Sequence, residues 1–169
     1  MKHAKILIVA ATFIFVAAMV SMLFVGETKA QGPTNAEDRA DRKATRLERI
    51  KVRGQNIVER TTIRVDRVLQ LNTKAGEIAG KMEQKGKDVS EARAFFETSS
   101  EKIASARAAL NEATTILTQL ETAENPLTVI QNFKAKIIEA YAALNAAKQN
   151  TLKGIKALKG ASGASASAN

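Results

Sequence analysis

The sequence contains no cysteine, one histidine and two prolines. Without cysteine there is no disulfide framework, no thiolate metal site and no cysteine lipidation. The histidine is His3, inside a segment that we expect to be a targeting leader, so the rest of the chain offers no imidazole for acid–base catalysis or metal binding. The sequence therefore predicts a protein that is not an enzyme and that uses no cofactor.

Aromatic residues are also scarce, at 4% of the chain against 45% for all hydrophobic residues. The core must be built from Ala, Leu, Ile and Val, and this composition, rich in Lys, Glu and Arg, favours long helices over a sandwich or an α/β fold. Few aromatics leave no stacking platform for single-stranded nucleic acid, and no helix-turn-helix or zinc pattern is present. The sequence argues against sequence-specific recognition of nucleic acid.

What the chain does have begins with a leader. Lys2 and Lys5 precede an apolar run over residues 6–25, and the segment ends at Ala30, a small residue of the kind that signal peptidases accept. Two alternatives follow: cleavage after Ala30, or retention of the run, about 20 residues long, as a membrane anchor. Both predict export of the rest of the chain to the periplasm, the cell surface or the medium.

Turn and cap signals divide the remainder into three segments. Gly86 precedes Asp88, whose spacing to Glu91 fits a capping box, and Asn125-Pro126 is a cap followed by proline at the first helical position. Residues 160–169 are small and uncharged, which predicts a disordered tail. The expected organisation is a linker at 31–36 and one domain over 37–159, with helices at about 36–85, 89–124 and 126–159.

Each segment repeats apolar residues in alternating steps of three and four, as a bundle seam requires. In the first segment the series is Leu47, Ile50, Gly54, Ile57, Thr61, Arg64, Val68, Leu71, Ala75, Ile78 and Met82. The connection at 124–126 is too short for anything other than an antiparallel turn. We predict an all-α fold: an antiparallel up-down-up three-helix bundle or coiled coil with a long first helix. The alternative is a set of helices that open out and pair between chains.

A column of basic residues runs beside this seam. Counting in sevens, the column is Arg39, Arg46, Arg53, Arg60, Arg67, Lys74 and Lys81, to which Arg42 and Arg49 add charge nearby. With Leu47 and Ile50 as core positions, the column occupies the flanking position g and extends about 63 Å at 1.5 Å per residue. These nine residues are the candidate surface for a polyanion or another partner.

The column has two interpretations. Its side chains can lay their stems over the seam and direct their charges to water or to the acidic second helix. Alternatively, the column is a track for a polyanion such as nucleic acid, an anionic polysaccharide or a layer of lipid headgroups. The formal net charge of +9 supports attraction to anionic partners in either case.

Leader, long helices and polar tail together resemble the small exported α-helical, coiled-coil proteins of bacterial envelopes. The outline is more weakly similar to basic periplasmic chaperones of the Skp/OmpH type. The first resemblance implies a non-enzymatic structural or adaptor protein that contacts a protein or an anionic envelope component through its basic first helix. The second implies a holdase-like chaperone, which should be a homo-oligomer, whereas a closed bundle should be a monomer. A polyanion binder is the third hypothesis, and an uncleaved leader would add membrane association.

Overall fold

The computed structural model describes residues 36–163 of the 169-residue chain, so the predicted leader, most of the linker and the end of the tail lie outside the described residues. Three α-helices follow one another: α2 (Ala36–Glu83), α3 (Ser90–Thr118) and α4 (Pro126–Gly163). The prediction of an all-α chain with three helices is confirmed for this part of the chain, where no strand occurs. None of the helices within residues 36–163 has an apolar stretch long enough to cross a membrane.

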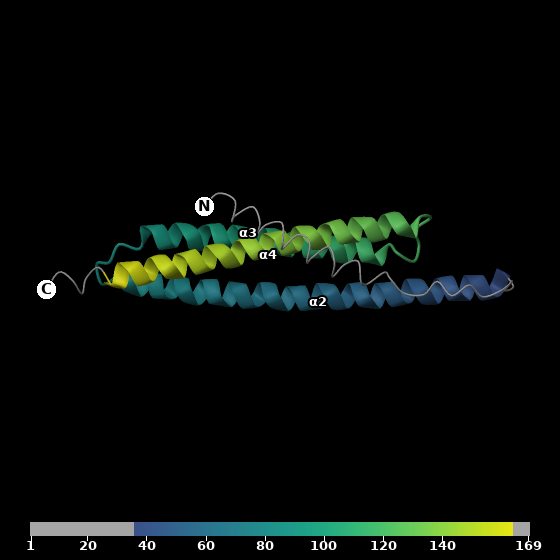
Figure 1. Ribbon diagram of the computed structural model, residues 1–169, viewed down its shortest axis with the longest axis horizontal. Helices are drawn as coiled ribbons and strands as arrows, with labels where there is room; N and C mark the ends of the chain where they lie inside the picture. The colour runs from purple at the N-terminus through teal and green to yellow at the C-terminus, as the bar shows by residue number, and fades with distance from the viewer. Residues whose placement is uncertain (1–35, 164–169) are drawn as a thin grey trace, which may run out of the picture.

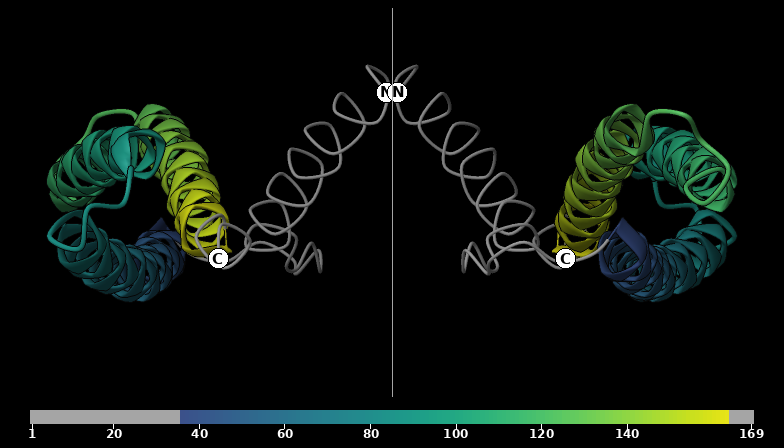
Figure 2. Two further views of the ribbon diagram at one scale, coloured as in Figure 1. Left: turned by 90° about the vertical axis from the view of Figure 1, so that its left-hand side faces the viewer. Right: turned by 90° about the vertical axis from the view of Figure 1, so that its right-hand side faces the viewer.

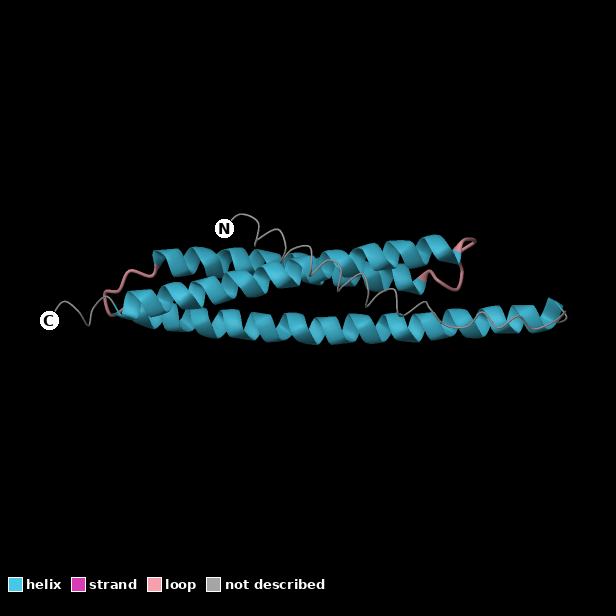
Figure 3. Ribbon diagram, in the orientation of Figure 1, coloured by secondary structure: helices cyan, strands magenta, loops and turns pink. Residues whose placement is uncertain are grey.

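The helices lie lengthwise beside one another, and α2 extends beyond the other two at its N-terminal end (Figure 1). The two connections lie at opposite ends of the molecule, so consecutive helices run in opposite directions (Figure 3). Viewed along its length, the molecule places the three helices around a common interior (Figure 2). Of the three pairs, α3 and α4 pack most extensively.

Small residues explain the close packing of α3 on α4. Ala106 and Ala113 of α3 and Ala140 and Ala147 of α4 are completely buried. An alanine side chain lets two helix backbones approach without a loss of packing density. The larger members of this main core cluster are Ile103, Leu110, Leu117, Leu120, Phe133, Ile137 and Leu144.

The end of α2 is set by Gly86, which has a φ of 74°. Its N–H donates to the Glu83 carbonyl at 2.8 Å, and the N–H of Lys87 donates to the Met82 carbonyl at 3.1 Å. This pair of bonds is the Schellman arrangement, which requires a left-handed residue and therefore favours glycine. Helix α2 thus ends where the sequence signal predicts a break.

Helix α3 then begins beside the carboxylate of Asp88. One carboxylate oxygen accepts hydrogen bonds from the Ser90 N–H at 3.0 Å and the Ser90 hydroxyl at 2.7 Å. The backbone bond is the main cause of a lowered pKa for Asp88, and the hydroxyl bond adds to it. The capping-box prediction made Glu91 the hydrogen-bond partner of Asp88. In the structure the Asp88 carboxylate is bound by Ser90 instead.

The C-terminal ends of α3 and α4 differ from the expected ones by a few residues. Helix α3 ends at Thr118, because the chain turns at 119–122 to bury Leu120 completely. Helix α4 begins at Pro126, as predicted, where the Leu127 N–H donates to the Asn125 side chain at 3.2 Å. It continues to Gly163 instead of ending at 159, since adding a residue to an existing helix costs far less than starting one.

Only every other predicted seam position holds in the second half of α2: Thr61 and Ala75 are buried as predicted, whereas the positions between them and beyond are not. Arg64 is exposed, Leu71 is 43% exposed and Ile78 is 52% exposed. The buried positions are instead Val65, Asn72 and Ala79, each one residue further along. On a straight helix, residues seven apart are displaced by about 20° round the axis, so a strict heptad drifts away from one face. A step of seven followed by a step of eleven covers 18 residues, which is five full turns, so residues related in this way return to the same face. Helix α2 follows the straight pattern and keeps one face inward.

Candidate partner-binding surface

All nine predicted basic residues of the first helix are exposed side chains of α2. They are Arg39, Arg42, Arg46, Arg49, Arg53, Arg60, Arg67, Lys74 and Lys81. The surface that these nine residues form therefore lies on a single helix.

The column counted in sevens does not stay on one face. Because each step of seven falls about 20° short of two full turns, six steps rotate the position by about 120°. Arg46 and Arg53 consequently stand close to the partly buried Ile50, while Lys74 and Lys81 have moved to the side of the helix opposite the buried Ala79. The predicted position g holds only for the first half of α2.

Four ion pairs link the helices, and their basic members are Lys51, Arg93, Arg107 and Lys136. Lys51 of α2 meets Glu121 at 2.6 Å, Arg107 of α3 meets Asp66 of α2 at 2.6 Å, Lys136 of α4 meets Glu112 of α3 at 2.6 Å, and Arg93 of α3 meets Glu83 of α2. Each pair keeps at least a quarter of its side-chain surface in solvent, so each contributes little to stability. Their effect is to align the helices.

The pair between Lys51 and Glu121 has a predicted pH dependence. The hydrogen bond from Lys51 lowers the pKa of the Glu121 carboxyl from 4.5. Stabilisation of the folded state by this carboxylate is therefore present above pH 4.5 and is lost as the pH falls through the lowered folded-state pKa. We expect an NMR titration of the Glu121 side chain to give a midpoint below 4.5, and Lys51→Gln to return it towards 4.5. Lys43→Gln, at an exposed position of the same helix, is the control and should leave the midpoint unchanged; a parent midpoint at or above 4.5 would contradict the assignment.

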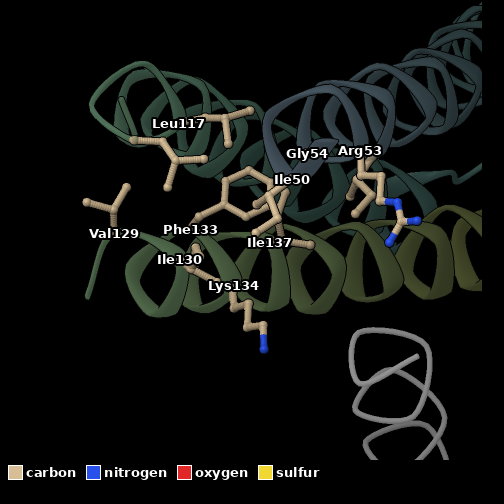
Figure 4. A pocket seen from close by; sticks show the side chains of 11 residues that line it. Ile50, Arg53, Gly54, Leu117, Val129, Ile130, Phe133, Lys134 and Ile137 are labelled. Atoms are coloured by element: carbon tan, nitrogen blue, oxygen red, sulfur yellow. The ribbon is translucent and has the colours of Figure 1, made fainter. Parts of the chain in front are cut away.

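A small apolar cavity lies between α2 and the end of the α3–α4 pair. Its volume is about 30 Å³, and Ile50, Leu117 and Phe133 are among the residues that line it (Figure 4). Arg53 and Lys134 stand at its edge with their nitrogens directed away from the apolar side chains. Because drug-sized ligands need pockets of about 300 Å³ or more, this cavity is a packing feature with room for about one water molecule.

The positions of the side chains also bear on metal binding and on acyl transfer. The described residues hold no group of three His, Cys, Asp or Glu side chains placed to bind a metal ion. Ser99 and Lys102 have the Ser-x-x-Lys spacing of some acyl-transfer enzymes. However, Ser99 is completely buried, its hydroxyl contacts the Ala147 carbonyl at 3.0 Å, and Lys102 is exposed. This serine has no access to a substrate.

A buried polar cluster, which the sequence pattern did not predict, joins all three helices. The Asn72 amide of α2 donates to the Phe96 carbonyl at 3.1 Å and to the Ser100 hydroxyl at 3.0 Å. Its carbonyl oxygen accepts from Thr151 of α4 at 3.2 Å, and Thr151 lies 2.8 Å from the Ser99 hydroxyl of α3. Ser99 also donates to the Ala147 carbonyl at 3.0 Å, so the two hydroxyl protons of Ser99 and Thr151 serve three contacts and one proton is shared between two acceptors.

This cluster is fully satisfied, since no buried side-chain polar atom among the described residues lacks a partner. A polar group inside an apolar interface penalises every register in which its partners are displaced. Asn72 therefore specifies how α2 lines up with α3 and α4. In the sequence, the only sign of this role is that Asn72 lies eleven residues after the seam residue Thr61. A count in steps of seven alone passes over Asn72.

Arg64 is the second omission, because the heptad placed it in the seam. The segment 41–50 (DRKATRLERI) recurs 18 residues later as 59–68 (ERTTIRVDRV), with acids, arginines and aliphatics in matching places. Eighteen residues make five turns, so equivalent positions share a face. The repeat defines an arginine face within an arc of about 60°, taking 100° per residue. Its members, all exposed, are Arg42, Arg46, Arg49, Arg53, Arg60, Arg64 and Arg67.

Comparison of the chain with protein-family models, with curated proteins and with solved structures gave no match. The case for a function therefore depends on the residues themselves. Among them, the exposed basic side of α2 is the feature that packing does not explain.

Proposed function

We propose that this protein is an exported, non-enzymatic structural or adaptor protein of the bacterial cell envelope. Its three helices act as an up-down-up bundle, and it contacts its partner through the basic side of α2. The observation that carries the proposal is the division of α2 into a face buried against α3 and α4 and a face of exposed arginines.

The shape of α2 supports a contact role. At 48 residues the helix is about 72 Å long, and its N-terminal part extends beyond the α3–α4 connection (Figure 1). The first buried residue of α2 among those whose burial is described is Gly54, and before it only the partly exposed Leu47 and Ile50 pack against the core, so these turns give little to it. A long charged projection of this kind adds surface without adding stability, which is expected of a binding element.

The absence of cysteine, and of histidine beyond His3, supports the non-enzymatic part of the proposal. The residues left for catalysis would be carboxylates, lysines and hydroxyls. Among the described residues, hydrogen bonds lower the pKa of the Asp88 and Glu121 carboxyls. A lowered pKa weakens a carboxylate as a general base.

Photo-crosslinking in cells that express the full chain tests this proposal. A photoreactive amino acid at Asn56, exposed on α2 beside the arginine face, should give a crosslinked product in the envelope fraction. The same amino acid at Asn111, equally exposed on α3, is the matched control and should give little or none. Combining the Asn56 probe with Arg49→Glu and Arg60→Glu should abolish the product.

Two results would count against the proposal. Products of equal yield from both positions would show that α2 is not the contact element, and would instead fit a holdase-like chaperone that surrounds its client. Recovery of the protein only in the cytoplasmic fraction would contradict the export that the leader predicts.

A further inference from the structure

We propose that the arginine face of α2 binds a linear acidic polysaccharide, along which carboxylate or sulfate groups recur at short intervals. This inference rests on the proposed contact role of α2 and names the chemical class of the partner. The binding surface is the arginine face, whose residues share one side of the straight helix, and not the column counted in sevens, which winds around it.

The spacing of the arginines suits a chain of regularly placed anions. From Arg42 to Arg67 the face extends about 38 Å, and most neighbouring members are three or four residues, or about 4.5–6 Å, apart along the axis. Past Arg67 the same face continues with the exposed aliphatic side chains of Leu71 and Ile78, so the charged stretch has a defined end. The result is a narrow, straight row, which matches one extended polymer chain.

Five of the eight acidic residues of α2 lie together on a different side of the helix. Asp41, Glu48, Glu59, Asp66 and Glu77 follow the same steps of seven and eleven, about 120° round the helix from the arginine face. Asp66 pairs with Arg107, which shows that this acidic side is turned towards α3. An anion on the arginine face is therefore kept away from these five carboxylates.

The neighbouring helix adds positive charge and little negative charge. Lys134 of α4 borders the same cavity as Arg53, so it lies next to the arginine face. The one acidic residue in the sequence of α4 is Glu139, which is held by Lys136 at 2.9 Å. The α4 side of the arginine face consequently favours an anionic ligand.

The arrangement is unfavourable for the isolated helix. Like charges four residues apart repel, and Arg60 and Arg64 stand at that spacing. Neither of them has an acidic residue three or four positions away in the sequence to relieve the repulsion. A bound polyanion would offset it, and guanidinium groups form paired hydrogen bonds with carboxylate and sulfate oxygens better than lysines do.

The surroundings favour a polysaccharide over two other polyanions. Helix α2 contains no aromatic residue, so bases of a single-stranded nucleic acid would have no side chain on which to stack. An amphipathic helix anchors firmly on a membrane by inserting apolar side chains beside its basic ones. Between Arg42 and Arg67 the arginine face holds no apolar side chain, and its exposed aliphatic residues, Leu71 and Ile78, come only beyond that stretch.

The test compares two triple variants of the full-length protein with equal changes of charge. In the face variant, Arg49→Gln, Arg60→Gln and Arg64→Gln remove three members of the arginine face. In the control variant, Arg39→Gln, Lys74→Gln and Lys81→Gln remove three exposed charges of the column that lie off the face. Binding to heparin and to polygalacturonate is measured by titration calorimetry over a salt series, with single-stranded oligonucleotide and phosphatidylglycerol vesicles as competing probes.

We expect the face variant to bind both polysaccharides at least about tenfold more weakly and with a shallower salt dependence, and the control variant to stay within about threefold of the parent. The thermal midpoint of the face variant should be no lower than that of the parent, since neutralising repelling charges does not harm the helix. A purely structural role for these arginines would lower it.

Three outcomes would overturn the inference. Equal losses in the two variants would mean that net charge, and not the arginine face, attracts the polymer. Absence of binding to both polysaccharides at low salt would exclude the class. Tighter binding of the oligonucleotide or the vesicles than of either polysaccharide would assign the face to a different partner. In these last two cases, an Asn56 crosslink that depends on the arginines would leave the contact role of α2 standing.

Discussion

Replacing Asn72 with alanine should lower the free energy of unfolding by about 2–4 kcal/mol, although the substitution removes only a short polar side chain. Asn72 is 5% exposed and bonds to groups on both other helices. Without it the Thr151 hydroxyl, which is completely buried, loses its acceptor on α2, and the space of the amide cannot be filled by a backbone held in three packed helices. The measurement is urea unfolding followed by far-UV circular dichroism.

Two further variants make this expectation specific. Asn56→Ala, at an exposed position of the same helix, should change stability by less than about 0.5 kcal/mol. The double variant Asn72→Ala, Thr151→Val should lose less than the sum of its single changes, because removing both partners leaves no orphaned hydroxyl. Simple additivity, or equal losses at Asn56 and Asn72, would show that the cluster does not act as a unit.

Replacing Gly154 with leucine should cost about 3 kcal/mol through overpacking. A Cβ at Gly154 of α4 would lie at or below 2.9 Å from three atoms of the Phe96 ring of α3. Phe96 is 6% exposed and has little room to move. Leucine is a better helix former than glycine by about 0.8 kcal/mol, so a loss cannot be attributed to helix propensity.

Gly76→Leu is the matched control for this substitution. Gly76 is also inside a helix, but a Cβ there would meet nothing within 4 Å, so the change should stabilise the protein by about 0.5–1 kcal/mol. Combining Gly154→Leu with Phe96→Ala should recover part of the loss, since the new side chain can occupy the space of the ring. Opposite signs at the two glycines are the expected result in thermal unfolding, and the same sign at both would refute the packing argument.

The number of helices and the places of both connections were predictable from the sequence because they depend on local chemistry. Gly86 supplies a left-handed residue, and Asn125 before Pro126 supplies a cap and a fixed φ. The apolar periodicity of α3 was equally clear, since Phe96, Ile103 and Leu110, spaced by seven residues, are buried. Such signals act within a few residues and need no knowledge of neighbouring helices.

The inward face of α2 was only half predictable from its own residues, since Thr61 and Ala75 are buried as the heptad requires whereas Arg64 is exposed. A count in steps of seven and a count in alternating steps of seven and eleven predict the same inward residues from Gly54 to Thr61. Beyond Thr61 the two predictions differ by one residue: the first buries Arg64 and the second buries Val65, as observed. The choice depends on whether α2 coils around its neighbours or lies straight against them, which is a property of the packed helices. The candidate basic residues were found, but their grouping into one face required that choice.

The sequence by itself determined the helical class, the turns and the concentration of positive charge on the first helix, because these follow from backbone propensity, caps and composition. Only the tertiary structure decided which arginines share a face and which polar residues meet in the core. Asn72, Ser99 and Thr151 are distant in the chain, and the hydrogen bonds among them exist because the packing of three helices removes water from that point. Packing sets the register, and the register determines which side of α2 remains exposed for binding.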